Sequence, residues 1–193
     1  MENLKEAISR FLKEPNSIKP LATNRIPSAV VIPFCERKDG YHILLLKKVD
    51  SNYPHGGQVC LPGGCHEERD CSLLTTALRE FEEETGIPSR HVEIAGALEP
   101  VETRSTNFII YPFVGFLPYP ESVKIDGVEI EKAFFVPLHF VLKNHPFPTE
   151  AYPYRGITFH TPIIRYQGET IWGATARILD RLMEVIKRAW TGR

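Results

Sequence analysis

The stretch GGCHEERDCSLLTTALREFEEETGI, residues 63–87, decides how the fold is read. A glycine pair opens it, a single glycine closes it, and a helical pattern lies between them. At about 100° per residue, one stripe of this helix is apolar and would face a core, comprising Leu74, Ala77, Leu78, Phe81 and Thr85. Beside that stripe, Glu80, Glu83 and Glu84 share an arc of about 100°. Glu82 points well away from them.

The three converging carboxylates are unfavourable for a helix that only has to fold. Acidic side chains three or four positions apart repel by about 0.2–0.5 kcal/mol per pair, and these lie near the C-terminal end, where the helix dipole favours cations. Arg79 offsets part of this through Glu83, four positions on. A solvated acidic face is the alternative interpretation. However, Mg²⁺ binds carboxylate oxygens, and residues that are unfavourable for local helix stability tend to mark functional sites. The pattern therefore predicts a metal site.

Residues 79–87, REFEEETGI, carry a resemblance to a known family. They match every specified position in the second half of the Nudix box, whose pattern is G, five residues, E, seven residues, then R-E-U-x-E-E-x-G-U with U apolar. In the first half, five residues lie between Gly64 and Asp70, which stands in place of Glu, and eight residues separate Asp70 from Arg79. The Asp and the extra residue resemble the coenzyme A pyrophosphatase branch of the Nudix hydrolase family.

This resemblance implies an α/β (α+β) fold, specifically a Nudix-type α/β/α sandwich with a mixed β-sheet. It also implies an enzyme that hydrolyses a nucleoside-linked diphosphate with Mg²⁺ or Mn²⁺ as cofactor. Carried over position by position, the metal ligands are Glu80, Glu83, Glu84 and the backbone carbonyl of Gly64. The carbonyl of Gly63 is the alternative to that of Gly64.

The catalytic roles also follow from the resemblance. Arg79 would hold the metal-binding carboxylates in place. A bound ion lowers the pKa of a water molecule and so generates the nucleophile, and a nearby glutamate can accept the proton. The general base stays open between Glu83 and Glu129, because Nudix enzymes take this residue from different places.

The sequence before the box bears on the substrate. The branch pattern there is L-L-T-x-R-S/A, three residues, R, three residues, G, three residues, F-P-G-G, and the chain matches it at Leu44, Leu45, Gly57, Pro62, Gly63 and Gly64. Lys48 and Tyr53 stand where the pattern has its two arginines, and neither reproduces the bidentate phosphate contacts of arginine. The substrate-binding candidates are Lys48, His55 and Gly63, and the resemblance as a whole extends over residues 28–190.

Three functions follow, in order of preference. The first is a Nudix pyrophosphohydrolase, a hydrolase acting on phosphoric anhydride bonds, that cleaves the pyrophosphate bond of coenzyme A or acyl-coenzyme A. The second keeps the reaction but changes the substrate to ADP-ribose, an NADH-like dinucleotide or a nucleoside triphosphate, because of Lys48 and Tyr53. The third is a catalytically silent nucleotide-binding sensor, which would be expected to lose box carboxylates that this helix retains.

Composition describes an ordinary soluble globular protein. The chain has 193 residues, a formal net charge of −1, 24% charged and 42% hydrophobic residues. No basic excess indicates a nucleic-acid surface, and no Lys/Arg cluster indicates a membrane patch. Residues 1–14 lack the apolar run of a secretory signal, so we expect a cytoplasmic protein. Its expected partners are a small-molecule nucleotide substrate and, as an option, a second copy of the chain in a homodimer.

Four cysteines offer an alternative metal site. Cys60, Cys65, His66 and Cys71, with His55 nearby, could be drawn as a zinc cluster. None of the spacings is the C-x₂-C of a zinc knuckle. In a reducing compartment, buried or incidental thiols are the preferred interpretation.

The element pattern predicts two parts, an N-terminal helix and linker at residues 1–27 and a Nudix hydrolase domain at residues 28–190. Predicted strands lie at 28–36, 41–49, 59–61, 92–99, 108–116, 130–136 and around 157–164. Predicted helices lie at 2–14, from about 71 to 86, at 137–143 and at 171–190. We expect Asp70 to cap the second of these helices and Gly86 to end it. Trp172 is interpreted as packing at the start of the last helix.

Overall fold

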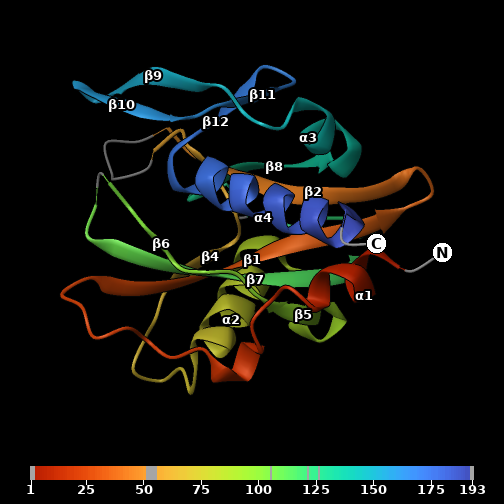
Figure 1. The fold of residues 1–193 in the computed structure, drawn as a ribbon. Helices are drawn as coiled ribbons and strands as arrows, with labels where there is room; N and C mark the ends of the chain where they lie inside the picture. The colour runs from red at the N-terminus through yellow and green to blue at the C-terminus, as the bar shows by residue number, and fades with distance from the viewer. Residues whose placement is uncertain (1–2, 51–55, 105, 121, 126, 192–193) are drawn as a thin grey trace.

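The computed structural model describes residues 3–50, 56–104, 106–120, 122–125 and 127–191. A central β-sheet has helix α4 (Gly173–Thr191) on one face and helix α2 (Leu73–Thr85) on the other (Figure 1). The remaining helical segments in the described chain are α1 (Leu4–Ser9), α3 (Leu138–Asn144) and the 3₁₀ turns Pro15–Ser17 and Ser89–His91. The predicted α/β/α sandwich is confirmed.

Eight strands of the described chain form one mixed sheet. They are β1 (Ile26–Arg37), β2 (Gly40–Lys48), β3 (Val59–Cys60), β4 (Gly63–Cys65), β5 (Glu93–Ala97), β6 (Val101–Glu102), β7 (Phe108–Pro118) and β8 (Ile130–Pro137). The order is β3-β2-β1-β7-β5, with β4 on β1, β6 on β7 and β8 on β2. The β1–β7 pair is parallel from Ile26 opposite Phe108 to Glu36 opposite Pro118, and the other pairs are antiparallel.

Strand β1 explains why the sheet needs cover on both faces. Successive side chains of a strand point to opposite faces, and a parallel sheet buried on both sides has an almost continuous apolar sequence. The α4 face receives Val30, Ile32 and Phe34. The α2 face receives Ala29, Val31 and Cys35. Each face of the sheet therefore has its own core, and β1 contributes side chains to both.

Helix α2 begins later than predicted. Ser72 is the N-cap, and its hydroxyl accepts from the backbone N–H of Thr75 at 3.1 Å. The prediction that Asp70 caps this helix is wrong, because the buried Asp70 carboxylate is bound by the Arg79 guanidinium instead. The predicted end is confirmed, since Gly86 is the C-cap with a φ of +66°, the left-handed conformation that glycine adopts without strain.

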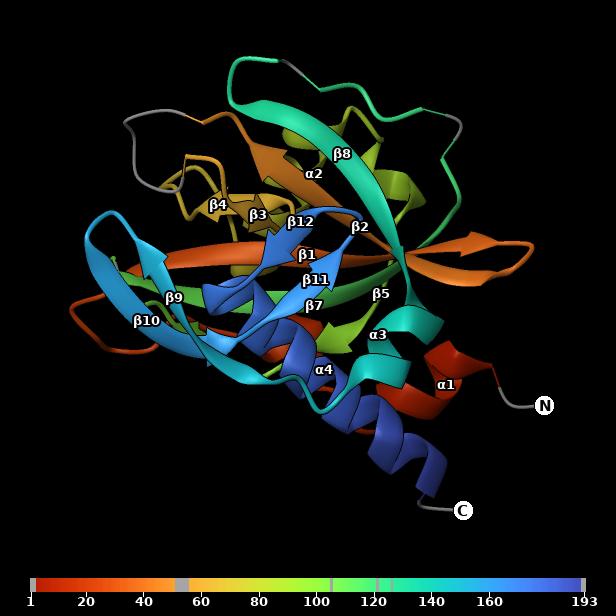
Figure 2. The same ribbon diagram turned by 90° about the horizontal axis from the view of Figure 1, so that it is seen from above.

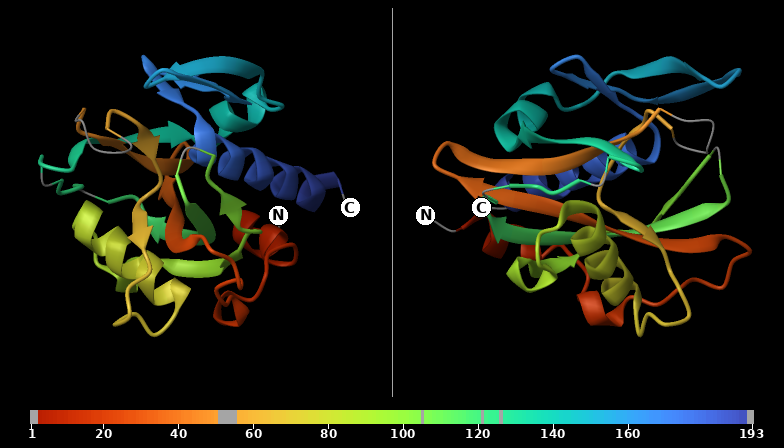
Figure 3. Two further views of the ribbon diagram at one scale, coloured as in Figure 1. Left: turned by 90° about the vertical axis from the view of Figure 1, so that its left-hand side faces the viewer. Right: turned by 180° about the vertical axis from the view of Figure 1, so that it is seen from behind.

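The C-terminal third contains more strand than predicted. Two hairpins, β9 (Thr149–Tyr154) with β10 (Ile157–Pro162) and β11 (Ile164–Tyr166) with β12 (Glu169–Ile171), lie on the α4 side of the sheet (Figures 1 and 3). The strand predicted around 157–164 is confirmed as β10, which ends at Pro162 before the chain passes to the next hairpin at Ile163, whereas β9, β11 and β12 were not predicted. The last helix begins two residues later than predicted, at Gly173. Ile171 matches the helical period and is fully buried, but it is the last residue of β12.

Helix α1 is shorter than the predicted 2–14. It ends at Ser9, and its buried Ala7 and Ile8 belong to the same core as α4, beside the C-terminal part of that helix (Figure 2). Strand β1 already begins at Ile26, while the division of the chain between residues 27 and 28 stays a prediction. None of the described helices combines the length and the apolar character needed to span a membrane.

Candidate active site

The glycine pair in β4 presses backbone against the acidic end of α2. The amide of Gly63 donates to Oε2 of Glu84 at 2.8 Å. A Cβ added to Gly64 would lie 2.5 Å from the carboxyl carbon of Glu80. The hydroxyl of Ser28 donates to the carbonyl oxygen of Gly64 at 2.8 Å and fixes the strand from the other side. Only glycine permits so close an approach of backbone to a side-chain carboxylate.

Arg79 is shared among several carboxylates. Its Nε and Nη2 donate to the two oxygens of Asp70, each at 3.0 Å. Its Nη1 donates to Glu80 at 2.8 Å and to Glu83 at 2.9 Å. Nη2 also lies 3.7 Å from the carboxylate of Glu67. The hydrogen bonds from Arg79 hold the pKa of Asp70 well below its usual range.

Glu84 is the most enclosed of the three box carboxylates. Its side chain is 10% exposed, against 18% for Glu80 and 52% for Glu83. Burial raises the pKa of Glu84 to about 7, with the Gly63 N–H and the Lys48 charge acting in the opposite direction and Glu80 adding to the rise. The ammonium of Lys48 lies 3.9 Å from Oε1 of Glu84.

Most of the candidate residues come together here. Glu129 directly precedes β8, its carbonyl accepts from the Val49 amide at 2.9 Å, and its charge acts on Glu84 and Lys48. Glu82 turns away as predicted, because its carboxylate accepts from the amide and the hydroxyl of Ser89, at 2.9 and 2.7 Å. The substrate-binding candidate His55 lies outside the described residues, as does Tyr53.

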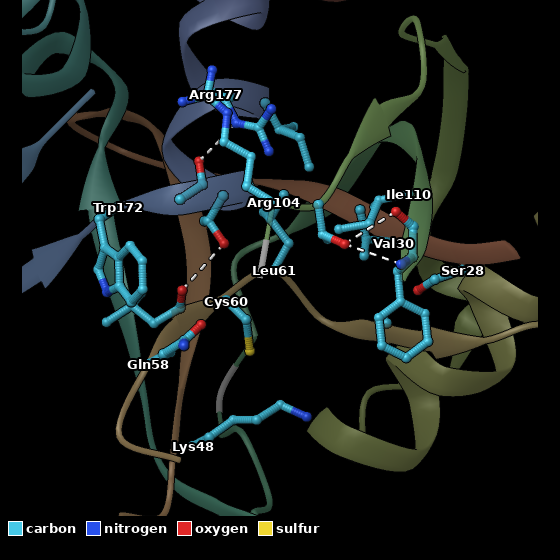
Figure 4. A pocket seen from close by; sticks show the side chains of 18 of the residues that line it. Ser28, Val30, Lys48, Gln58, Cys60, Leu61, Arg104, Ile110, Trp172 and Arg177 are labelled. Carbon is cyan, nitrogen blue, oxygen red and sulfur yellow. Dashed lines mark hydrogen bonds between the residues drawn. The ribbon is translucent and has the colours of Figure 1, made fainter. Parts of the chain in front are cut away.

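A pocket of about 240 Å³ opens beside the glycine pair (Figure 4). Lys48, Gly63 and Gly64 contribute to one end, next to the α2 carboxylates. Trp172 forms one wall, only 8% exposed, and stacks on Tyr152 with ring centroids 4.5 Å apart. The expected packing role of Trp172 at the start of α4 is confirmed, and the same ring also lines the pocket.

Several residues of this region were not found from the sequence. Arg104 and Arg177 line the pocket from the loop after β6 and from α4, more than 70 residues apart. Asp70 was placed at a helix cap rather than on Arg79. Neither arginine belongs to a local motif, so no sequence signal marked them. Position 70 did carry a signal, because Asp stands there in place of the Glu of the Nudix-box pattern.

The family is decided by comparison with known proteins. A family model described as the NUDIX domain matches residues 25–155, which is more than half of the chain. The chain belongs to the Nudix family. Membership makes it a Nudix hydrolase, a pyrophosphohydrolase whose family acts on small-molecule nucleotide substrates and generally uses divalent metals such as Mg²⁺ or Mn²⁺.

Relatives agree with this Nudix assignment over the full length. The uncharacterized Nudix hydrolase NudL of Photorhabdus laumondii subsp. laumondii is 34% identical over 189 residues, covering 97% of this chain and 100% of its own. NudL of Yersinia enterocolitica is 34% identical over 185 residues, covering 95% and 93%. These names specify no substrate.

Solved structures share the Nudix fold at low identity. A Caenorhabditis elegans Ap4A hydrolase binary complex superposes with a TM-score of 0.55 at 15% identity, covering 87% of this chain and 99% of that one. A MutT protein from Methanosarcina mazei Go1 gives a TM-score of 0.52 at 19% identity, covering 90% and 98%. At these identities the likeness establishes the architecture alone.

The Nudix box residues fit a divalent cation by their chemistry. Hard divalent ions take carboxylate and carbonyl oxygens. Burial raises the pKa of Glu80 and of Glu84, so a bound cation would stabilise the charged form of each carboxylate. Within the described residues, no three His, Cys, Asp or Glu side chains are arranged to hold a metal as they stand. Glu80 and Glu83 each give one carboxylate oxygen to Arg79, which leaves the other oxygen of each carboxylate to an ion.

Proposed function

We propose that this Nudix hydrolase cleaves the pyrophosphate bond of coenzyme A or acyl-coenzyme A. The products would be adenosine 3′,5′-bisphosphate and a phosphopantetheine fragment. The observation that carries the proposal is that the pocket and the Nudix-box carboxylates lie against the same two residues, Gly63 and Gly64. Gly63 and Gly64 line the pocket and touch Glu84 and Glu80 with their other side, so a diphosphate lying along this backbone reaches the carboxylates.

In this proposal Glu80, Glu83, Glu84 and the Gly64 carbonyl hold Mg²⁺ or Mn²⁺, which neutralises the diphosphate and activates a water when bound. The Gly64 oxygen accepts one hydrogen bond, from Ser28, and a carbonyl has a second lone pair. Arg79 positions Glu80 and Glu83, since it already binds both.

The remaining roles concern charge and proton transfer. Lys48 lies at the pocket end beside Glu84 and supplies a cation to the diphosphate. Glu83 is a candidate general base because half of its side chain is exposed, so water reaches the carboxylate although one of its oxygens is bound by Arg79. Glu129 is the other candidate, since its charge acts at Glu84 from the segment that directly precedes β8.

A second substrate class has one specific observation in its favour. Lys48 occupies the position of an arginine in the branch pattern, and it is a point charge that cannot grip a phosphate with two parallel bonds. ADP-ribose, an NADH-like dinucleotide or a nucleoside triphosphate presents a diphosphate to the same carboxylates without requiring that grip.

A metal-dependent substrate panel tests the proposal. The full chain, with Mg²⁺ or Mn²⁺ and with chelator as control, is given coenzyme A, acetyl-coenzyme A, ADP-ribose, NADH and a nucleoside triphosphate, and the products are separated by ion-exchange chromatography. We expect the highest kcat/KM on a coenzyme A substrate and no turnover with chelator. Cleavage of another member of the panel while coenzyme A stays intact would contradict the proposal.

A further inference from the structure

The pocket carries positive charge at both ends. Figure 4 shows Lys48 at one end, pointing toward α2, and Arg104 with Arg177 at the other. Between them lie apolar and aromatic walls that include Trp172. The diphosphate accounts for Lys48, which lies beside the box carboxylates. It leaves the distant arginine pair without a role.

The two arginines are held together against their mutual repulsion. Burial lowers the pKa of Arg177, and the charges of Arg104 and Arg181 lower it further, with Glu102 offsetting only part. The carboxylate of Glu102 is paired with Arg25 at 3.0 Å. An anion placed between the guanidinium groups would relieve this unfavourable arrangement.

Backbone carbonyls orient both guanidinium groups. Nη2 of Arg177 donates to the carbonyl of Glu102 at 2.6 Å, and Nη1 of Arg104 donates to the carbonyl of His160 at 2.8 Å. Within the described part of the chain, neither group forms an ion pair with a carboxylate. The charge of Arg177 is therefore offset only in part, by Glu102. Both groups keep further N–H donors available, because a guanidinium carries five.

The arginine pair is also open to solvent on its outer side. Arg104 and Arg177 line a second, more open cavity, together with the paired Arg25 and Glu102 and the polar Thr103, Thr106 and Asn107. A charged group entering from this side reaches both guanidinium groups while the rest of its molecule occupies the enclosed pocket. Hydroxyl and amide groups at the rim suit an anion that stays partly hydrated.

We propose that Arg104 and Arg177 form a second anion subsite, which binds a phosphomonoester of the substrate separate from the scissile diphosphate. The 3′-phosphate of coenzyme A is a group of this chemistry, so the identity of the substrate rests on the proposed function above. Two guanidinium groups match the oxygens of a doubly charged phosphate. The branch pattern has two arginines before the Nudix box that this chain lacks. The arginines of the proposed subsite come instead from the loop after β6 and from α4.

Paired substrates test the subsite. Coenzyme A and 3′-dephospho-coenzyme A differ by one phosphate, and kcat/KM for each is measured with wild type, Arg104→Gln and Arg177→Gln. We expect wild type to prefer coenzyme A by about tenfold or more, as one lost charged hydrogen bond corresponds to roughly that factor, and each variant to reduce this ratio toward one. An equal loss on both substrates overturns the subsite, since a purely structural role would act on both.

Arg181→Gln is the matched control. Arg181 lies one turn along α4 from Arg177 and also donates to backbone carbonyls, those of Glu99 and Pro100, but it does not line the pocket. We expect its substrate ratio to equal that of wild type. If the ratio fell as far in Arg181→Gln as in Arg177→Gln, the loss of one positive charge anywhere near the site would explain it, and the proposal would be overturned.

A binding measurement separates failure of the subsite from failure of the proposed function. Calorimetry compares adenosine 3′,5′-bisphosphate with adenosine 5′-monophosphate, with Mg²⁺ present, on wild type, Arg177→Gln and Arg181→Gln. If neither coenzyme A substrate is cleaved, the proposed function fails. The subsite is still supported if wild type and Arg181→Gln bind the bisphosphate more tightly than the monophosphate and Arg177→Gln does not. Equal affinity of wild type for both nucleotides overturns it.

Discussion

The two ends of the pocket differ in charge and in how they are built. At the α2 end, carboxylates from one helix turn crowd around a single guanidinium, and Gly64 leaves no space for a side chain against Glu80. At the other end, Arg104 and Arg177 come from separate elements and are steadied by backbone carbonyls. An acidic end that requires a cation and a basic end that requires an anion together suit a metal-bound, multiply phosphorylated molecule.

The largest expected effect is at the acidic end. Glu84→Gln keeps the hydrogen bond from Gly63 but removes the charge that faces the proposed ion. We expect kcat to fall by at least about 100-fold, since even outer partners of metal ligands are worth 10–100-fold. Steady-state kinetics at saturating Mg²⁺ measures this. Glu82→Gln is the control on the same helix, because Glu82 faces Ser89 instead; full activity in Glu84→Gln would remove the proposed site.

Next comes the pairing that holds Arg79. Asp70→Asn leaves a partly buried guanidinium without its bidentate partner, and breaking a buried pair costs about 3 kcal/mol in free energy of unfolding. Urea unfolding measures this loss. The exposed Asp39→Asn serves as control, with an expected change within about 0.5 kcal/mol. A loss no larger in Asp70→Asn than in the control would show that the pair adds nothing.

The same pair predicts a pH dependence. Because the folded pKa of Asp70 is depressed, its contribution to stability is present above the unfolded pKa of about 3.9 and is lost as the pH falls through and below that value. Wild type should therefore lose stability between about pH 5 and pH 2, and Asp70→Asn should lose less over the same range. Parallel curves for the two proteins would contradict the assignment.

A smaller effect distinguishes the two glycines of β4. Gly64→Ala pushes on the flexible Glu80 carboxylate, so we expect kcat to fall by about tenfold, in line with displacing a metal ligand's support, and the melting temperature to change little. Gly63→Ala meets the backbone of Ala29 and Val30 at a φ of +150°, so it should lower the melting temperature more. The reverse order in thermal denaturation would contradict this reading of the strand.

The smallest expected effect concerns the wall between the two ends. Trp172→Leu removes an aromatic ring that lines the pocket, and contact of such a ring with an aromatic group of the substrate would contribute about 0.5–1.5 kcal/mol beyond area burial. We expect KM to rise by about threefold to tenfold with kcat nearly unchanged. Trp190→Leu is the control, because that ring is 46% exposed and does not line the pocket. A change in kcat alone would place Trp172 with the chemistry rather than with binding.

Much of the acidic end could be read from the sequence. The convergence of Glu80, Glu83 and Glu84, the divergence of Glu82 and the end at Gly86 all follow from the helical period and from cap chemistry, which act within one or two turns. The contact of Arg79 with Glu83 follows from the same period. The errors in this stretch lie before the helix, where Ser72 rather than Asp70 is the cap.

The sequence by itself determined the family, the mixed sheet between two helical layers, and the helix that carries the carboxylates, because each rests on local periodicity or on a contiguous motif. Only the tertiary structure decided that Asp70 binds Arg79, that Gly64 lies against Glu80, and that Arg104, Trp172 and Arg177 line one pocket. The first contact depends on the path of the loop before α2. The others join segments that meet only when β4, the loop after β6 and α4 are in place in the folded chain, and no period along the chain encodes such a meeting.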